Sequence, residues 1–164
     1  SGGEPTASAP FLFAVLDLLQ GKTHRAVETC GYTDRDTFAA LLSRVEHLLF
    51  DIKIVNDALH KRYTGVSNAP ILANFKTLAA SETPFTVRTP LIPSVTDTEE
   101  NLRAIAALLQ TAGVGSIELL PYNKAAGAKY KSVGREYTVD FDGSAEPQPH
   151  EEIFSQYDIE VQVL

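Results

Sequence analysis

Residues 47–53 read HLLFDIK, an apolar run that is bounded by polar residues and ends in an acidic and a basic side chain. A run of this length predicts a β-strand that is buried on both faces, as in parallel sheets. The next segment, 56–63, predicts a short helix that ends at Thr64-Gly65, because glycine commonly follows the last turn of a helix. A strand followed by a helix is the unit from which parallel α/β folds are built.

The same unit recurs on both sides of this stretch. Predicted strands begin near residues 24, 47, 85 and 116, and a last strand covers 159–164. Helices are predicted over 11–19, 34–43, 56–63, from 68, over 97–112 and over 151–156. Because parallel neighbours are joined by right-handed crossovers, we expect an α/β fold with parallel strands and flanking helices.

Capping residues mark the predicted helix starts. Thr33 followed by Asp36 predicts the start of the second helix, and Asn68 is expected to cap the fourth. Thr96 and Glu99 have the spacing of a capping box at the start of the longest helix.

The composition narrows the class of protein. Of 164 residues, 44% are hydrophobic and 21% are charged, and the net charge is −7. These values fit a folded globular protein and disfavour disorder and nonspecific nucleic-acid binding. We find no apolar run of the roughly 18–20 residues that cross a bilayer and no secretory signal, so we expect a cytoplasmic location. The single cysteine excludes disulfides within the chain and a metal site built mainly from its thiolates.

Charged side chains gather where the predicted strands end. In parallel α/β folds, chemistry takes place at the carboxyl ends of the strands. A glycine-rich turn at the start of the first helix lets a backbone approach a ligand closely. The residues concerned are Gly2, Gly3, Glu4, Glu28, Thr29, Asp51, Lys53, Arg88 and Asn123.

A ligand that carries both an ammonium and a carboxylate suits this set. Glu4 could accept from the ammonium, and Lys53 and Arg88 could donate to the carboxylate. Glu28 with Asp51 could instead hold a cation. Each residue also has a structural interpretation, such as a solvated ion pair or a side-chain stem that covers apolar surface.

Six motifs in order carry a resemblance to a known family. They are SGGEP at 1–5, ETCGY at 28–32, DIKIVNDALH at 51–60, TGVSN at 64–68, VRTPLIP at 87–93 and ELLPYN at 118–123. With these motifs the sequence resembles the radical S-adenosylmethionine (radical SAM) superfamily. Within it, the sequence is most similar to glycyl radical enzyme activating enzymes, in particular the group that activates pyruvate formate-lyase.

The resemblance implies a partial (β/α) barrel and an oxidoreductase. Family members cleave S-adenosylmethionine with a 4Fe-4S cluster, and the 5′-deoxyadenosyl radical takes a hydrogen atom from a glycine of a partner enzyme. An electron donor such as flavodoxin or ferredoxin is implied as well. By motif match, the residues that bind S-adenosylmethionine are Gly2, Gly3, Glu4, Glu28, Thr29, Asp51, Lys53, Arg88 and Asn123.

The resemblance also implies two further sites. Glu28, Thr29 and Asp51 match positions that hold a monovalent cation. Asp57 and His60 match the segment that receives the glycine-bearing loop of the partner enzyme.

Three departures from the family pattern stand out. Cys30 replaces the usual Asn or Thr, and we do not expect it to be a ligand; Asn123 replaces the usual His after Pro-Tyr. The cluster motif CxxxCxxC belongs before Gly-Gly-Glu-Pro, and the printed sequence begins at Ser1.

We therefore expect residues 1–164 to be one incomplete radical SAM core domain, the C-terminal portion of an activating enzyme. Residues 1–123 would form the strand–helix units, and 124–164 a loop, a short helix and a final strand. We expect the chain alone to be inactive and its open first strand to pair with another copy.

Two other functions stay open on the residues alone. One is a nucleotide- or phosphate-binding α/β module that needs no iron. The other is a barrel aldolase or isomerase with Lys53 as Schiff-base nucleophile, which Asp51 disfavours because it stabilises the charged amine.

Overall fold

The computed structural model describes residues 3–123, 134 and 141–164. Gly2 and most of the segment predicted as a loop after Tyr122 therefore lie outside the described residues.

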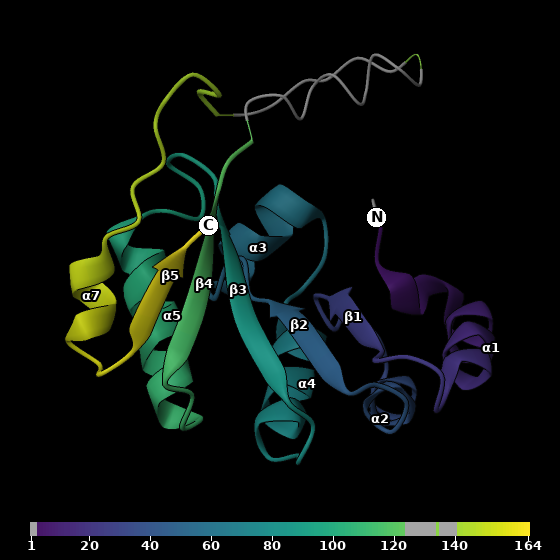
Figure 1. The fold of residues 1–164 in the computed structure, drawn as a ribbon. Coiled ribbons are helices and arrows are strands. Elements are labelled where there is room, and N and C mark those ends of the chain that lie inside the picture. The colour runs from purple at the N-terminus through teal and green to yellow at the C-terminus, as the bar shows by residue number, and fades with distance from the viewer. Residues whose placement is uncertain (1–2, 124–133, 135–140) are drawn as a thin grey trace.

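Five parallel strands form one sheet in chain order (Figure 1). They are β1 (Ala26–Thr29), β2 (His47–Asp51), β3 (Phe85–Leu91), β4 (Ser116–Pro121) and β5 (Glu160–Val163). The described helical elements are the 3₁₀ helix η1 (Pro5–Ser8), α1 (Ala9–Leu19), α2 (Arg35–Leu42), α3 (Asp57–Thr64), α4 (Ala69–Ala79), α5 (Glu99–Thr111) and α7 (Glu151–Ser155). The predicted parallel α/β architecture is confirmed, and the carboxyl ends of the strands meet at the upper edge of the sheet in Figure 1.

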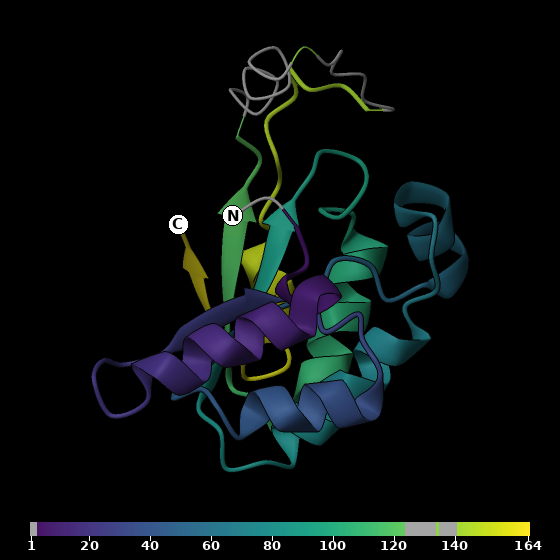
Figure 2. The same cartoon turned by 90° about the vertical axis from the view of Figure 1, so that its right-hand side faces the viewer.

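One face of the sheet is apolar and covered by helices (Figure 2). Along each strand, the apolar residues of this face alternate with residues of the other face, because successive side chains of a strand point to opposite sides. Phe50 from β2 packs between Phe38 of α2 and Phe75 of α4, with ring centroids 6.0 and 5.7 Å apart. The apolar stripe of α5 is fully buried in the same core: Leu102, Ile105, Ala106 and Leu109.

The opposite face carries polar and charged side chains. In β2, Leu48 and Phe50 are buried, whereas His47, Leu49 and Asp51 are only partly buried. The prediction that this strand is buried on both faces is therefore wrong. The reason is that no described helix covers the open face, as the side view in Figure 2 shows.

Two predicted helix caps are displaced. The side chain of Asp34, not Thr33, caps α2 by accepting from Thr37 N at 2.9 Å. In α5 the cap is Thr98, which accepts from Asn101 N at 3.3 Å, so the predicted capping box lies two residues too early. The hydroxyl of Thr96, the predicted cap, instead donates to Pro90 O and accepts from Ile92 N, at the end of β3.

Helix α1 packs beside β1, the edge strand of the described sheet. Arg25 joins them, donating to the Leu16 carbonyl at 3.1 Å and pairing with Glu46. Leu16 is buried, but Phe11 is 73% and Leu18 68% exposed. The outer side of α1 is thus apolar and faces solvent in the described structure.

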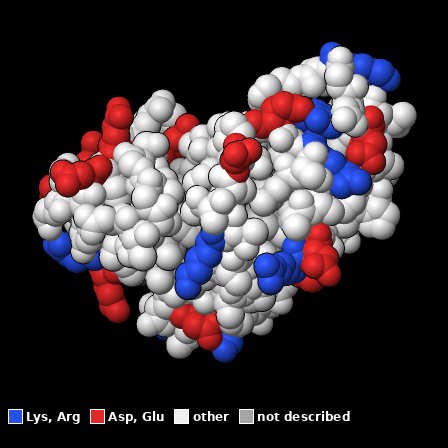
Figure 3. Space-filling view, turned by 90° about the horizontal axis from the view of Figure 1, so that it is seen from below, with Lys and Arg blue, Asp and Glu red and all other residues white. Residues whose placement is uncertain are grey.

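The amino ends of the strands form the lower side of the molecule. Seen from below, acidic and basic side chains are interspersed among uncharged surface (Figure 3). In the parts of the chain that the structure describes, no helix has the length and apolar character needed to span a membrane.

Candidate functional site

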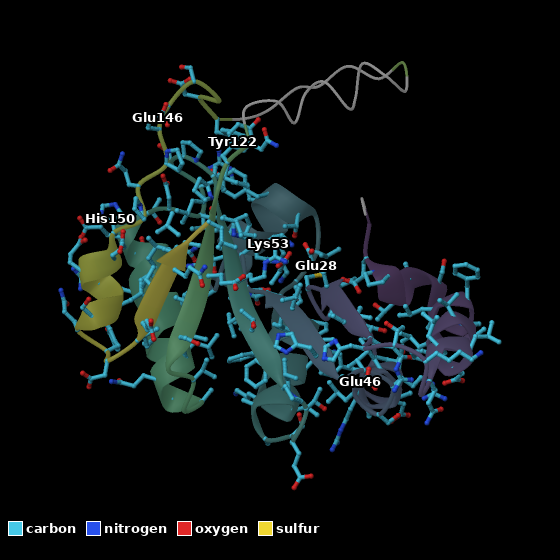
Figure 4. All side chains as sticks on the ribbon, in the orientation of Figure 1. Glu28, Glu46, Lys53, Tyr122, Glu146 and His150 are labelled. Atoms are coloured by element: carbon cyan, nitrogen blue, oxygen red, sulfur yellow. The ribbon has the colours of Figure 1, made fainter. Side chains whose placement is uncertain are left out.

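A cleft of about 680 Å³ opens at the carboxyl ends of β1 and β2. Six of the predicted site residues line it together with Cys30, namely Gly3, Glu4, Glu28, Thr29, Asp51 and Lys53. The labelled Glu28 and Lys53 lie at this end of the sheet in Figure 4, whereas Glu46 lies at the opposite end. The topology therefore brings together residues that are up to 50 positions apart in the sequence.

Glu4 is held by the end of β1. Its Oε1 accepts from Thr29 Oγ1 at 2.5 Å and from Thr6 Oγ1 at 2.7 Å, and its Oε2 accepts from Cys30 N at 3.0 Å. Burial of the carboxyl opposes ionisation, but the hydrogen bonds from Thr29, Thr6 and Cys30 outweigh it and lower the pKa of Glu4. Glu4 is therefore a fixed negative charge at neutral pH.

Cys30 stabilises that charge with its side chain as well. Its Sγ lies 3.1 Å from Glu4 Oε2, so the thiol donates to the carboxylate. Burial and the neighbouring Glu4 raise the pKa of Cys30 to about 11. The residue is therefore a protonated thiol at neutral pH in this environment.

Asp51 and Lys53 form an ion pair inside the cleft. Lys53 Nζ lies 3.3 Å from Asp51 Oδ2. Burial raises the pKa of Asp51, with Lys53 opposing the shift and Glu28 adding to it. Burial thus disfavours the charged state of Asp51, and a cationic group beside it would favour that state.

Arg88 spans the open face between two carboxylates. Its Nη1 lies 3.1 Å from Glu28 Oε2, and its Nε lies 3.8 Å from Glu118 Oε2. In the parallel register Arg88 is opposite both Asp51 and Glu118. Glu118 is a site residue that the sequence reasoning missed, although the period of two and the register place it beside Arg88.

Two buried polar atoms in the site make no hydrogen bond. Among the described residues, Asp51 Oδ1 and Arg88 Nε are buried without a hydrogen bond. Their side chains are only 14% and 15% exposed. One atom accepts and the other donates, so a ligand with polar groups of both kinds would satisfy them.

Gly3 leaves space at the mouth of the cleft. A Cβ built on Gly3 would meet no described atom within 4 Å, so packing within the described chain does not require a glycine here. Asn123 lies exposed beyond β4 and is not among the residues that line the cleft.

Asp57 is the first residue of α3 and His60 lies three residues later. Neither residue lines the cleft. Asp57 accepts from Ser67 Oγ at 2.6 Å and pairs with Lys61. The ring of His60 is buried, and its Nδ1 lies 2.8 Å from the Val66 carbonyl. Both side chains thus stabilise the connection between α3 and α4 through these bonds.

Comparison with known proteins identifies relatives of the chain. A family model described as the Radical SAM superfamily matches residues 1–106. The isethionate sulfite-lyase activating enzyme of Nitratidesulfovibrio vulgaris is 45% identical over 139 residues, which cover 83% of this chain and 45% of that protein. The pyruvate formate-lyase-activating enzyme of Streptococcus mutans is 33% identical over 157 residues, covering 91% of this chain and 59% of that protein.

A solved structure is similar over the whole chain. The crystal structure of a domain of pyruvate-formate lyase-activating enzyme from Bacteroides vulgatus has a TM-score of 0.77 and 27% sequence identity. The match covers 100% of this chain and 96% of that one. The chain spans about half the length of the curated relatives that it matches.

Proposed function

Because the chain belongs to the radical SAM superfamily, we propose that its cleft binds the methionyl end of S-adenosylmethionine. The relatives are activating enzymes of glycyl radical enzymes. We therefore propose that this chain is the cofactor-binding part of such an activating enzyme, an oxidoreductase that acts on a glycine of a partner protein.

The observation that carries the proposal is that charges of both signs surround two buried atoms that make no hydrogen bond. Glu4 supplies a fixed negative charge, and Lys53 and Arg88 supply positive ones, at the same end of the sheet. Asp51 Oδ1 and Arg88 Nε are an acceptor and a donor that make no hydrogen bond within the described residues, although Nε lies 3.8 Å from Glu118 Oε2. A zwitterionic amino-acid group matches both the charges and the empty hydrogen-bonding positions.

The ammonium of the ligand would replace one of the groups that now donate to the Glu4 carboxylate. Five contacts from Thr6, Thr29 and Cys30 already fill its two oxygens. The thiol of Cys30 is the weakest of these donors, so we propose that the ammonium displaces it. The backbone N–H of Cys30 and the hydroxyl of Thr29 would keep the carboxylate in position.

Lys53 and Arg88 would donate to the carboxylate of the ligand. Lys53 can turn from Asp51, which is 3.3 Å away, because its four-carbon stem has free rotation. Arg88 would keep Glu28 on Nη1 and turn Nε, which makes no hydrogen bond and lies 3.8 Å from Glu118 Oε2, toward the ligand. Asp51, released from Lys53, would share a monovalent cation with Glu28 and Thr29, as we propose from their common place in the cleft.

The reaction needs a group that these residues do not hold. A 4Fe-4S cluster with bound S-adenosylmethionine supplies the 5′-deoxyadenosyl radical, and it takes three cysteine thiolates. The sequence has one cysteine, so the residues present do not supply this set. We propose that the cluster ligands belong to another part of a longer protein, and that the 164-residue chain alone is inactive.

Anaerobic reconstitution of the chain with iron and sulfide tests that part of the proposal. We expect no stoichiometric iron and no release of 5′-deoxyadenosine when S-adenosylmethionine and reductant are added. Stoichiometric iron with turnover would contradict it.

The partner would be a glycyl radical enzyme, and the electron donor a flavodoxin or ferredoxin. A pyruvate formate-lyase is one candidate partner, and the name of the relative with 45% identity adds isethionate sulfite-lyase as another. We propose that Asp57 and His60 shape the surface that receives the partner's loop, since their own side chains are bonded within the connection between α3 and α4.

The Glu4→Gln and Lys53→Met variants test the ligand assignment. Each removes one charge that the proposal gives to a different end of the ligand, so each is expected to weaken binding of S-adenosylmethionine by about tenfold or more. The control is Lys76→Met, a change of the same kind on an exposed position of α4. Unchanged affinity in both site variants would refute the assignment.

A further inference from the structure

We propose that Asn101 is a positioning residue that holds Lys53 in place for the carboxylate of the ligand. The inference rests on the proposed function, because it concerns how the chain orients a residue of that site. Asn101 belongs to the first turn of α5 and does not line the cleft.

The segment that carries Lys53 has no regular secondary structure of its own. Residues 52–55 follow β2 and precede the cap of α3. Ile52 and Ile54 are buried, 1% and 3% exposed, whereas Lys53 between them lines the cleft. The backbone of this segment therefore sets the point from which the Lys53 stem reaches the ligand, even though the stem itself can rotate.

Side chains from three other elements bind the four consecutive carbonyls of the segment. Thr89 of β3 donates to Ile52 O at 2.7 Å. Asn68, before α4, donates to Ile54 O at 3.0 Å and Val55 O at 2.7 Å.

Asn101 supplies the bonds at Lys53 itself. Its Nδ2 donates to Lys53 O at 2.8 Å and to Thr96 O at 2.9 Å, and its Oδ1 accepts from Val55 N at 3.1 Å. Both amide donors are used, and the residue is 6% exposed. A buried amide that satisfies three backbone groups at once fixes their relative positions.

Asn101 also connects two loops that follow the carboxyl ends of neighbouring strands. Lys53 lies in the connection after β2, and Thr96 lies in the connection after β3. Without the Asn101 amide, the Lys53 carbonyl and the Val55 N–H would lose these hydrogen bonds. Water would then compete for them, and the segment would sample other positions.

The test is a double-mutant cycle measured by calorimetry on the 164-residue chain. Asn101→Ala is expected to weaken binding of S-adenosylmethionine by about tenfold, equal to about 1.4 kcal/mol. In the Lys53→Met background the same change is expected to have less than about a twofold effect, because residues that act through one another are not additive. 5′-Methylthioadenosine, which lacks the amino-acid carboxylate, is expected to bind Asn101→Ala and the unsubstituted chain alike.

Asn74→Ala is the matched control. Asn74 is a buried asparagine whose Nδ2 also donates to two carbonyls, Gly31 O and Thr33 O, both at 2.9 Å. These belong to the loop after β1, so its effect is expected to add to that of Lys53→Met. If Asn101→Ala does not fold, Asn101→Ser is measured in the same cycle.

The outcomes separate the inference from the proposed function. Failure of the unsubstituted chain to bind S-adenosylmethionine overturns both. Binding by the unsubstituted chain that Asn101→Ala leaves unchanged, or losses that add in the cycle, overturn the positioning role alone.

Discussion

At the residue scale, the site is a set of charges whose states are fixed by their neighbours. The hydrogen bonds from three residues lower the pKa of Glu4 and keep it ionised, whereas burial and the neighbouring Glu4 raise the pKa of Cys30 and keep it protonated. Sequence motifs identified Glu4, but not the bond between the Cys30 thiol and its carboxylate. That contact depends on where the 3₁₀ helix η1 meets the end of β1, which no spacing in the sequence encodes.

The reactivity of Cys30 is the first prediction at this scale. Because its pKa is raised to about 11, alkylation by iodoacetamide should be slow at pH 8 and should rise steeply only as the pH approaches 11. In Glu4→Gln the acceptor charge is gone, so the pKa of Cys30 falls and alkylation at pH 8 accelerates. Equal rates in the two proteins would contradict the contact; unfolded protein in denaturant gives the reference rate.

The second prediction concerns the donor on β1. Thr29→Val removes a hydroxyl that donates to the buried Glu4 carboxylate, and it should lower the free energy of unfolding by about 1–3 kcal/mol. Thr29→Ser, which keeps the hydroxyl, should restore most of that loss. Urea denaturation measures both variants, and equal stability of the two would refute a role for the hydroxyl.

The pH dependence of stability follows from the sign of the Glu4 shift. The pKa of Glu4 in the fold lies below its ordinary value of 4.5, so the folded state favours the ionised form. Its stabilisation is complete above that ordinary value and is lost as the pH falls through the lowered pKa. The loss of stability on acidification below pH 4.5 should be smaller in Glu4→Gln than in the unsubstituted chain, as measured by urea denaturation at a series of pH values.

At the scale of elements, hydrophobic period and glycine positions were enough to predict the order of strands and helices. The apolar stripe of α5 and the end of α3 at Gly65, with φ of 81°, are both as expected. Helix caps were less predictable, because Asp34, Thr96 and Thr98 all have side chains that can cap. The choice among them depends on the path of the preceding loop, which tertiary hydrogen bonds decide.

The cap of α5 gives a prediction that distinguishes a cap at Thr98 from a capping box formed by Thr96 and Glu99. Thr98→Ala should lower the free energy of unfolding by about 1 kcal/mol, because it removes the side-chain acceptor for Asn101 N. Glu99→Ala, at the position that the sequence suggested as part of a capping box, should cost clearly less. Chemical denaturation of the two variants decides between them, and a larger loss for Glu99→Ala would contradict the structure.

At the scale of the whole molecule, the sheet has one covered and one open face. The open face could not be anticipated from the strand at 47–53 alone, since a run of apolar residues does not show that one of its faces lacks a helix. The parallel register then places Asp51, Arg88 and Glu118 side by side on that open face. Topology, rather than local sequence, thus assembles the site.

The edge strand carries a prediction of its own. β1 pairs with β2 alone in the described sheet, and the outer side of α1 exposes Phe11 and Leu18. We expect copies of the 164-residue chain to associate through this edge at high concentration. Light scattering measures the association, and Phe11→Glu with Leu18→Lys should reduce it; a chain that stays monomeric with protected amides over 26–29 would contradict the expectation.

The central claim is that the cleft recognises the amino-acid end of S-adenosylmethionine, and one calorimetric comparison tests it most directly. S-adenosylmethionine, 5′-methylthioadenosine and adenosine monophosphate are titrated into the same preparation of the chain. Binding of S-adenosylmethionine at least about tenfold tighter than the other two is the predicted result, because only it carries the ammonium and carboxylate for Glu4, Lys53 and Arg88. Equal affinity for all three, or a preference for the phosphate, would contradict the claim and favour a nucleotide-binding module.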